Sequence, residues 1–274
     1  MMRIVRNTRP VFLFIAIFLI VSMQLHAQDL NFSQYFNTPL LVNPANTGFN
    51  PDFDYRAGGN FRTQWASVGS PYKTTSAWAD TKIFANRFEN GWMGIGASFQ
   101  RDDAGSGNLV GTSAAVSIAY HQMLGYKSLL SAGFSAGYAA KRVDITKLTF
   151  DNQWNGQFFE STIPPNEPFA FSQVGYFDLG VGLNYALFAS ENAYFNAGLS
   201  IMHVNRPSES FFSNTVSQGR VDMRYTFFAN ASIKIQDLWI VNPNIYISSK
   251  TQTNEIVLGF NANRNVSGDG VQQM

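Results

Sequence analysis

Strict alternation between apolar and small residues runs through most of this chain and restricts what it can fold into. In 92–100, four apolar side chains alternate with Gly, Gly, Ser and Gln, and 130–138 and 176–185 repeat the pattern. A period of two indicates β-strands, and about ten residues is the length that crosses a bilayer at a tilt. Because the second face is small and polar rather than charged, the pattern predicts an all-β chain forming a transmembrane antiparallel β-barrel.

A soluble β-sandwich is the alternative, since its strands also alternate. Sandwich strands usually run about 5–6 residues, however, and their outer face is typically charged. A barrel also satisfies every backbone group in lipid by closing on itself. We therefore favour the barrel.

The alternation predicts about ten strands, joined by connections of two lengths. The predicted strands are 54–65, 74–85, 91–101, 109–122, 129–141, 173–187, 193–203, 221–235, 238–249 and 254–263. Connections after the first, third, fifth and seventh strands are long, and those after the second, fourth, sixth and eighth are short. With a periplasmic N-terminus, this places the long loops outside the cell, as in bacterial outer-membrane barrels.

Residues 1–27 are typical of a secretory signal peptide. A start with three Arg precedes eleven apolar residues from Val11 to Val21, too few for a comfortable membrane helix, and cleavage is predicted after Ala27. An uncleaved membrane anchor is the alternative. Removing three Arg from the formal net charge of +1 leaves −2, so no basic excess favours nucleic acid. Export and alternation together predict the bacterial outer membrane as the destination.

Three further parts follow the signal peptide. Residues 28–52 do not alternate and contain three Pro; we expect this segment either to plug the barrel lumen or to contact a periplasmic partner. Residues 53–264 form the predicted barrel. Residues 265–274 are a polar tail, so either the barrel closes at ten strands or the chain is a truncated version of a larger barrel. We favour the larger barrel.

Residues that could carry chemistry do not form a catalytic pattern. The chain has no Cys, and the G-x-S-x-G match at 133–137 lies inside an alternating segment rather than at a strand-to-helix elbow. His121 and His203 lack metal-ligand spacing. Asp102-Asp103 is expected in a solvated loop, with calcium binding as the alternative. The sequence therefore predicts no enzyme, no cofactor and no metal.

The long connection 142–172 is unusually aromatic. Its large rings are Phe150, Trp154, Phe158, Phe159 and Phe169. Exposed aromatic clusters are unusual without something to bind. A binding surface and a lid folded on itself both remain open for this loop.

Short motifs along the chain resemble the PorP/SprF family of Bacteroidetes outer-membrane proteins, associated with type IX secretion. They occur in the family's order and span most of the mature chain. The motifs are Phe32-Ser33-Gln34-Tyr35, Pro39, Asn43-Pro44-Ala45, Gly48, Arg62-x-Gln64-Trp65, Lys147-Leu148-Thr149-Phe150-x-Asn152-Gln153 and His203-x-Asn205-x-Pro207 with Ser210-Phe211-Phe212.

The resemblance implies a non-enzymatic outer-membrane barrel that works with type IX secretion components. It implies as partners the membrane lipid, those components and a secreted adhesin or other cargo, engaged through its C-terminal sorting domain. From the motifs and the loops together, the residues expected to contact partners are Gln34, Tyr35, Pro39, Asn43, Pro44, Gly48, Arg62, Trp65, Phe150, Trp154, Phe158, Phe159, Pro207 and Phe211. A passive or substrate-specific channel is the alternative function, and a barrel enzyme using Ser135 is a weaker one.

Overall fold

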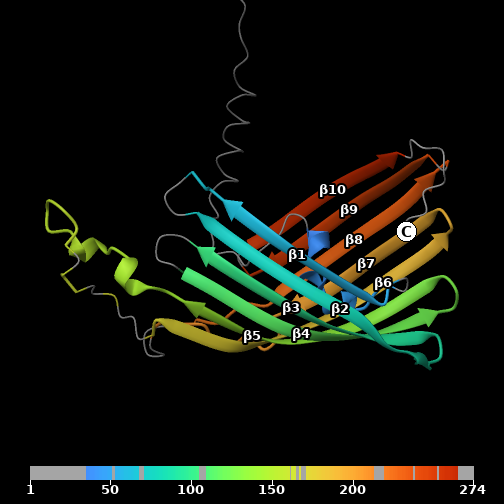
Figure 1. Cartoon of the computed structure of the whole chain (residues 1–274), viewed down its shortest axis with the longest axis horizontal. Helices are drawn as coiled ribbons and strands as arrows, with labels where there is room; N and C mark the ends of the chain where they lie inside the picture. Colours follow the sequence, from blue (N-terminus) through green and yellow to red (C-terminus); the bar gives the residue numbers. More distant parts are fainter. Residues whose placement is uncertain are drawn as a thin grey trace, which may run out of the picture. The chain divides into compact units, whose positions relative to one another are not determined.

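Ten antiparallel strands form one sheet in the order of the sequence (Figure 1). The computed structural model describes residues 35–50, 53–67, 71–104, 109–160, 162–164, 167, 171–212, 219–236, 238–251 and 253–264. The strands are β1 (Tyr55–Gln64), β2 (Tyr72–Phe88), β3 (Gly91–Ala104), β4 (Leu109–Leu124), β5 (Ser128–Arg142), β6 (Gln173–Ser190), β7 (Ala193–Met202), β8 (Arg224–Ile235), β9 (Trp239–Lys250) and β10 (Thr253–Arg264). The predicted signal peptide and polar tail lie outside the described residues.

The strands predicted from alternation are confirmed, with differences at their ends. β2 extends to Phe88, beyond an irregularity in its pairing with β3. The register of that pairing shifts between Ile83 and Phe88, and Phe84 has a positive φ of 57°. β3 extends to Ala104, so the prediction that Asp102 lies in a loop is wrong. Its carboxylate accepts a hydrogen bond from the Thr74 hydroxyl of β2 at 2.7 Å.

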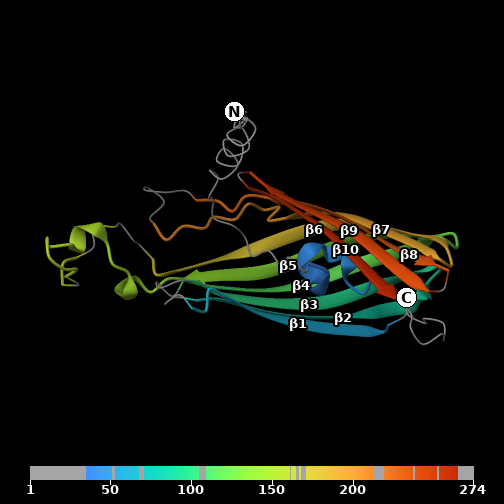
Figure 2. The same ribbon diagram turned by 90° about the horizontal axis from the view of Figure 1, so that it is seen from above.

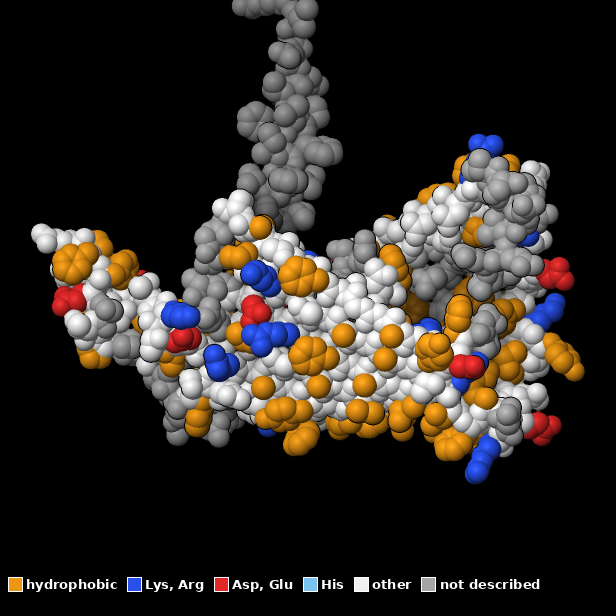
Figure 3. Space-filling view, in the orientation of Figure 1, with side chains coloured by type: hydrophobic (Ala, Val, Ile, Leu, Met, Phe, Trp, Pro, Cys, Tyr) orange, Lys and Arg blue, Asp and Glu red, His pale blue; other side chains and the backbone are white. Residues whose placement is uncertain are grey.

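The two faces of the sheet differ as the alternation predicts. Apolar side chains lie exposed on the outer face, between charged groups that gather toward the strand ends (Figure 3). The inner face buries small polar side chains, which include Ser76, Ser117, Ser131, Ser135, Asn184, Ser200 and Ser248. Among the described residues, no helix is both long and apolar enough to cross a bilayer.

The segment 35–50 lies on this inner face, where the sheet curves around it (Figure 2). It consists of three short helical turns, η1 (Tyr35–Asn37), α2 (Pro39–Val42) and η2 (Pro44–Asn46). Pro39 and Pro44 open their turns at a position where the missing N–H costs nothing. Asn43 caps η2, because its side chain accepts a hydrogen bond from the Ala45 amide at 2.8 Å.

The first and last strands each have one neighbour in the described part of the chain. β1 pairs with β2, from Tyr55 opposite Thr81 to Gln64 opposite Tyr72, and β10 pairs with β9. No ladder joins β1 to β10 among the residues that the structure describes. The sheet therefore has two open edges.

Candidate functional site

Asn43 lies at the centre of the contact between the N-terminal segment and the sheet. The side chain is fully buried, and its Nδ2 donates to the backbone oxygens of Leu183 in β6 at 2.9 Å and Leu199 in β7 at 3.2 Å. Its Oδ1 meanwhile caps η2. One amide group thus binds two strands and holds its own turn, which a shorter or apolar side chain cannot do.

Glycines in the strands allow the backbone of the segment to approach closely. A Cβ on Gly133 would lie 2.3 Å from the Ala45 nitrogen, and one on Gly94 would lie 2.0 Å from the Thr47 oxygen. No side chain fits at these distances. The Gly-rich inner face predicted from the sequence therefore packs directly against the backbone of the segment. This face includes Gly133, the first residue of the G-x-S-x-G match.

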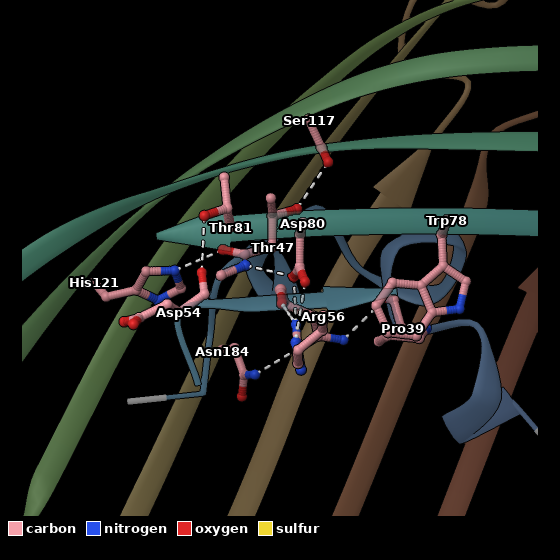
Figure 4. A network of polar contacts seen from close by, with 12 residues as sticks. Pro39, Thr47, Asp54, Arg56, Trp78, Asp80, Thr81, Ser117, His121 and Asn184 are labelled. Carbon is pink, nitrogen blue, oxygen red and sulfur yellow. Dashed lines mark hydrogen bonds and ion pairs between the residues drawn. The ribbon is translucent and has the colours of Figure 1, made fainter. Parts of the chain in front are cut away.

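An ion pair holds the end of the segment. Arg56 in β1 and Asp80 in β2 lie directly opposite each other and form a salt bridge. The Asp80 carboxylate is almost fully buried and accepts a hydrogen bond from the Gly48 amide at 2.6 Å, while Arg56 Nη2 donates to the Asn46 oxygen at 2.7 Å. Figure 4 shows this network, in which both charged groups bind the segment as well as each other.

His121 is a structural residue of the same network. Its Nε2 lies 2.7 Å from the Thr47 oxygen and its Nδ1 lies 2.7 Å from the Ser131 hydroxyl. Because a carbonyl oxygen only accepts, Nε2 carries the proton and Nδ1 accepts from Ser131. The ring also stacks on Trp92, with centroids 5.1 Å apart. Both nitrogens are engaged, so this imidazole is not placed as a base for Ser135.

The other end of the segment joins the two sides of the sheet. Tyr35 stacks on Tyr246 of β9, and its hydroxyl donates to the Asn230 side chain of β8 at 2.7 Å. Two residues later, the Asn37 oxygen accepts hydrogen bonds from Trp78 of β2 and Asn60 of β1. A single turn of chain thus connects β1 and β2 with β8 and β9.

Replacing Tyr35 by Phe is expected to lower the free energy of unfolding by about 1 kcal/mol, because the stack on Tyr246 stays while the hydrogen bond is lost. Burial and the neighbouring Tyr246 raise the pKa of Tyr35 from 10.0 to about 12. The unfolded chain therefore loses the phenol proton first, and this residue's contribution to stability is lost between about pH 10 and pH 12. Urea unfolding of both proteins in lipid vesicles at several pH values measures both effects.

The Tyr35→Phe protein should lose less stability than the native chain over that pH window. Tyr126→Phe is the matched control, because Tyr126 lies fully exposed in the turn between β4 and β5. Parallel pH curves for the native and Tyr35→Phe proteins would contradict the assigned role of the Tyr35 hydroxyl.

A second candidate region lies in the connection between β5 and β6. It contains η3 (Ile145–Lys147) and η4 (Asp151–Gln153). Gln153 is buried; its Nε2 donates to the Ile163 oxygen at 2.9 Å, and its Oε1 accepts from the Phe150 amide at 3.0 Å. Trp154 and Phe159 form a β-bridge with their rings in edge contact at 5.2 Å. The loop is thus held by its own contacts while half of each large ring stays exposed.

The connection between β7 and β8 lies against the same ends of β5 and β6. Lys141 of β5 forms an ion pair with Glu209 at 2.5 Å. The Phe171 amide donates to the Phe211 oxygen at 3.0 Å, and the Val221 amide donates to the Pro207 oxygen at 2.9 Å. These contacts fix the segment 203–212 beside the end of β5.

The predicted contact residues therefore fall into two groups. Inside the sheet lie Tyr35, Pro39, Asn43, Pro44 and Gly48. At or beyond the strand ends lie Arg62, Trp65, Phe150, Trp154, Phe158, Phe159, Pro207 and Phe211, all partly or well exposed. Gln34 lies outside the described residues. The sequence reasoning missed Arg56 and Asp80, although one Arg and one Asp facing each other across two predicted strands were the available signal.

Comparisons with known proteins place the chain in a family. No curated protein matches it. Among solved structures it is similar to the translocator domain of autotransporter NalP from Neisseria meningitidis, with 12% identity, a TM-score of 0.34, and coverage of 77% of this chain and 85% of that one. The family described as type IX secretion system membrane protein PorP/SprF matches residues 24–268, which confirms the resemblance indicated by the motifs. The chain belongs to the PorP/SprF family of type IX secretion system membrane proteins.

Proposed function

We propose that this chain receives or anchors a secreted surface protein at the outer membrane, by binding the C-terminal sorting domain of that cargo. We call six of the contact residues, which lie beyond the ends of β5 and β7, the loop surface: Phe150, Trp154, Phe158, Phe159, Pro207 and Phe211. The observation that carries this proposal is the exposure of Trp154, Phe158 and Phe159, whose residues are 49%, 56% and 51% exposed. They stay exposed although hydrogen bonds and a β-bridge within the loop hold it together. The family assignment supports a role in type IX secretion, and the loop surface supports the binding role.

Rigid aromatic side chains are suited to binding another protein. Gln153 and the Trp154–Phe159 bridge hold the loop in one conformation, so little conformational entropy is lost when a partner binds. Trp is among the residues that most often dominate protein interfaces. The loop extends beyond the ends of β5 and β6 (Figure 1), away from the apolar band of the strands. This supports a protein partner for these rings rather than membrane lipid.

A binding role without catalysis also fits the inner face. Ser135 lies inside β5 opposite Ser117, and His121 lies four residues farther along β4, where Thr47 and Ser131 engage it. The segment 35–50 occupies the space that a channel would need for its solute. We therefore favour a plugged receptor over a channel. A large, steady conductance of the native protein in planar bilayers would support the channel instead.

Replacing Trp154, Phe158 and Phe159 together by Ala is expected to weaken binding of a cargo sorting domain by about 100-fold, because buried aromatic anchors commonly contribute 2 kcal/mol or more. The measurement is surface plasmon resonance, with the full chain in lipid nanodiscs and the purified C-terminal sorting domain of a type IX cargo as the probe.

Tyr126→Ala is the matched control, since it removes an exposed aromatic ring from a turn at the opposite strand ends. Equal affinity of the triple variant and this control would contradict the loop surface as the binding site. Unfolding of each variant in lipid vesicles is measured in parallel, so that a loss of fold is separated from a loss of contacts.

A further inference from the structure

The charged residues of β3, β4 and β5 all lie at one end of these strands. β3 carries Arg101, Asp102 and Asp103 near its last residue, and β5 carries Lys141 and Arg142 as its last two. In these three strands, which the structure describes in full, β4 and the opposite ends of β3 and β5 contain no Lys, Arg, Asp or Glu. The long connection after β5 leaves from the charged end, so the expected orientation of the barrel places this end at the outer leaflet.

Four charged side chains at this end lie on the outer face of the sheet. Lys73 of β2 lies opposite Asp103 of β3. In the next strand, Val110 of β4 lies between Asp103 and Arg142 and is opposite both. Arg101 lies two residues before Asp103, and its guanidinium donates to the Asp103 carboxylate at 3.0 Å and 3.2 Å. We call Lys73, Arg101, Asp103 and Arg142 the basic row.

The outer face becomes apolar directly beside the basic row. Phe99 lies two residues before Arg101, and Tyr138 lies four residues before Arg142. Alternation therefore puts these rings and cations on the same face. Tyr138 lies opposite Phe177 of β6, with the two rings in edge contact at 5.4 Å, and all three ring residues are exposed. Cations just beyond exposed aromatic rings lie at the level where lipid headgroups meet the acyl chains.

We propose that the basic row binds a lipid of the outer leaflet whose headgroup carries two phosphate groups. Three cations and one carboxylate give the row a formal net charge of +2, which suits an anionic headgroup. Asp103 accepts from Nε and Nη2 of Arg101, so this bond fixes the guanidinium and leaves its other N–H groups for a ligand. A guanidinium held in this way binds phosphate through charge-assisted hydrogen bonds.

The length of the basic row supports two phosphate groups rather than one. Lys73 and Arg142 are three strands apart, which is about 14 Å at the usual spacing of neighbouring strands. A headgroup with a single phosphate contacts one end of the row, whereas a headgroup with two separated phosphates contacts both. The acyl chains of the same lipid then lie along the apolar outer face, over Phe99 and Tyr138.

The position of the basic row favours a lipid over a protein ligand. Its residues belong to strands, whereas the loop surface proposed for cargo lies beyond the strand ends. A protein bound at the row would have to displace lipid from the apolar face beside it (Figure 3). The lipid site is therefore separate from the cargo site, and neither proposal depends on the other.

Titration with purified lipids, followed by native mass spectrometry of the full chain in detergent, tests the proposal. The probes are lipid A with two phosphate groups, with one and with none. We expect the diphosphorylated lipid to bind at least tenfold more tightly than the phosphate-free lipid, because two headgroup charges meet the row. Replacing Lys73 or Arg142 by Gln should weaken binding of the diphosphorylated lipid about fivefold, and replacing both should weaken it about 25-fold.

Arg87→Gln combined with Lys127→Gln is the matched control, because both residues are exposed cations at the opposite strand ends. This control should bind all three lipids as the native chain does. Urea unfolding of each variant separates a loss of fold from a loss of binding, and the single variants carry the test if the double variant does not fold. Equal affinity for the diphosphorylated and phosphate-free lipids, or equal losses in the double variant and the control, would overturn the proposal. Equal affinity for one and two phosphate groups would overturn the assignment of two.

Discussion

Replacing Gly133 by Ala is expected to detach the N-terminal segment from the sheet and to lower the free energy of unfolding by about 3 kcal/mol. The new Cβ would lie 2.3 Å from the Ala45 nitrogen and 2.5 Å from the Pro44 oxygen, and both atoms belong to backbone that no rotamer change can move aside. Urea unfolding in lipid vesicles measures the stability.

Chymotrypsin cleavage reports the detachment directly, because Leu40 is buried in the native chain and becomes accessible when the segment leaves the sheet. The matched control is Gly111→Ala in β4, where the nearest atom to the new Cβ is the Lys141 Cγ at 4.0 Å. Equal stability and equal cleavage of the two variants would show that the close approach at Gly133 does not hold the segment.

Replacing Asp80 by Ala is expected to cost about 3–5 kcal/mol, the effect of removing one partner from a buried ion pair. The variant leaves the Arg56 guanidinium without its carboxylate and the Gly48 amide without its acceptor. Tryptophan fluorescence during urea unfolding is a suitable measurement, because Trp92 donates to the Gly48 oxygen at 2.8 Å and so reports on the same contact.

The control is Asp103→Ala, which breaks an exposed ion pair with Arg101 and is expected to change stability by less than about 1 kcal/mol. A cost for Asp80→Ala as small as that of the control would contradict the role of the pair in holding the segment. The double variant Arg56→Ala with Asp80→Ala should cost less than the sum of the single variants, because no unpaired charge remains.

The strands are predictable from the sequence because their signal is local. Every second residue faces the small inner surface, so each segment shows the pattern without knowledge of its neighbours. The ends are less predictable, as at Phe84, where a positive φ shifts the register without any change in composition.

The position of the N-terminal segment is not predictable in this way. Asn43 binds the backbone oxygens of Leu183 and Leu199, which lie 140 and 156 residues away, and a backbone oxygen leaves no mark in the sequence. The glycines opposite the segment can be read from the sequence, but a glycine in a strand does not show which part of the chain packs against it. The motif residues Tyr35, Asn43 and Gly48 resemble contact residues in the sequence and lie buried in the structure.

The bonds made by Tyr35 have a consequence for the order of folding. This residue is made early, and its partners Asn230 and Asn244 follow 195 and 209 residues later. Contacts of such long range are slow to form. The Tyr35 end of the segment therefore lacks these partners until β8 and β9 have followed, whereas its other end can already bind Asp80 and His121. A chain interrupted before β8 would leave this end of the segment without the hydrogen bonds that join it to the far side of the sheet.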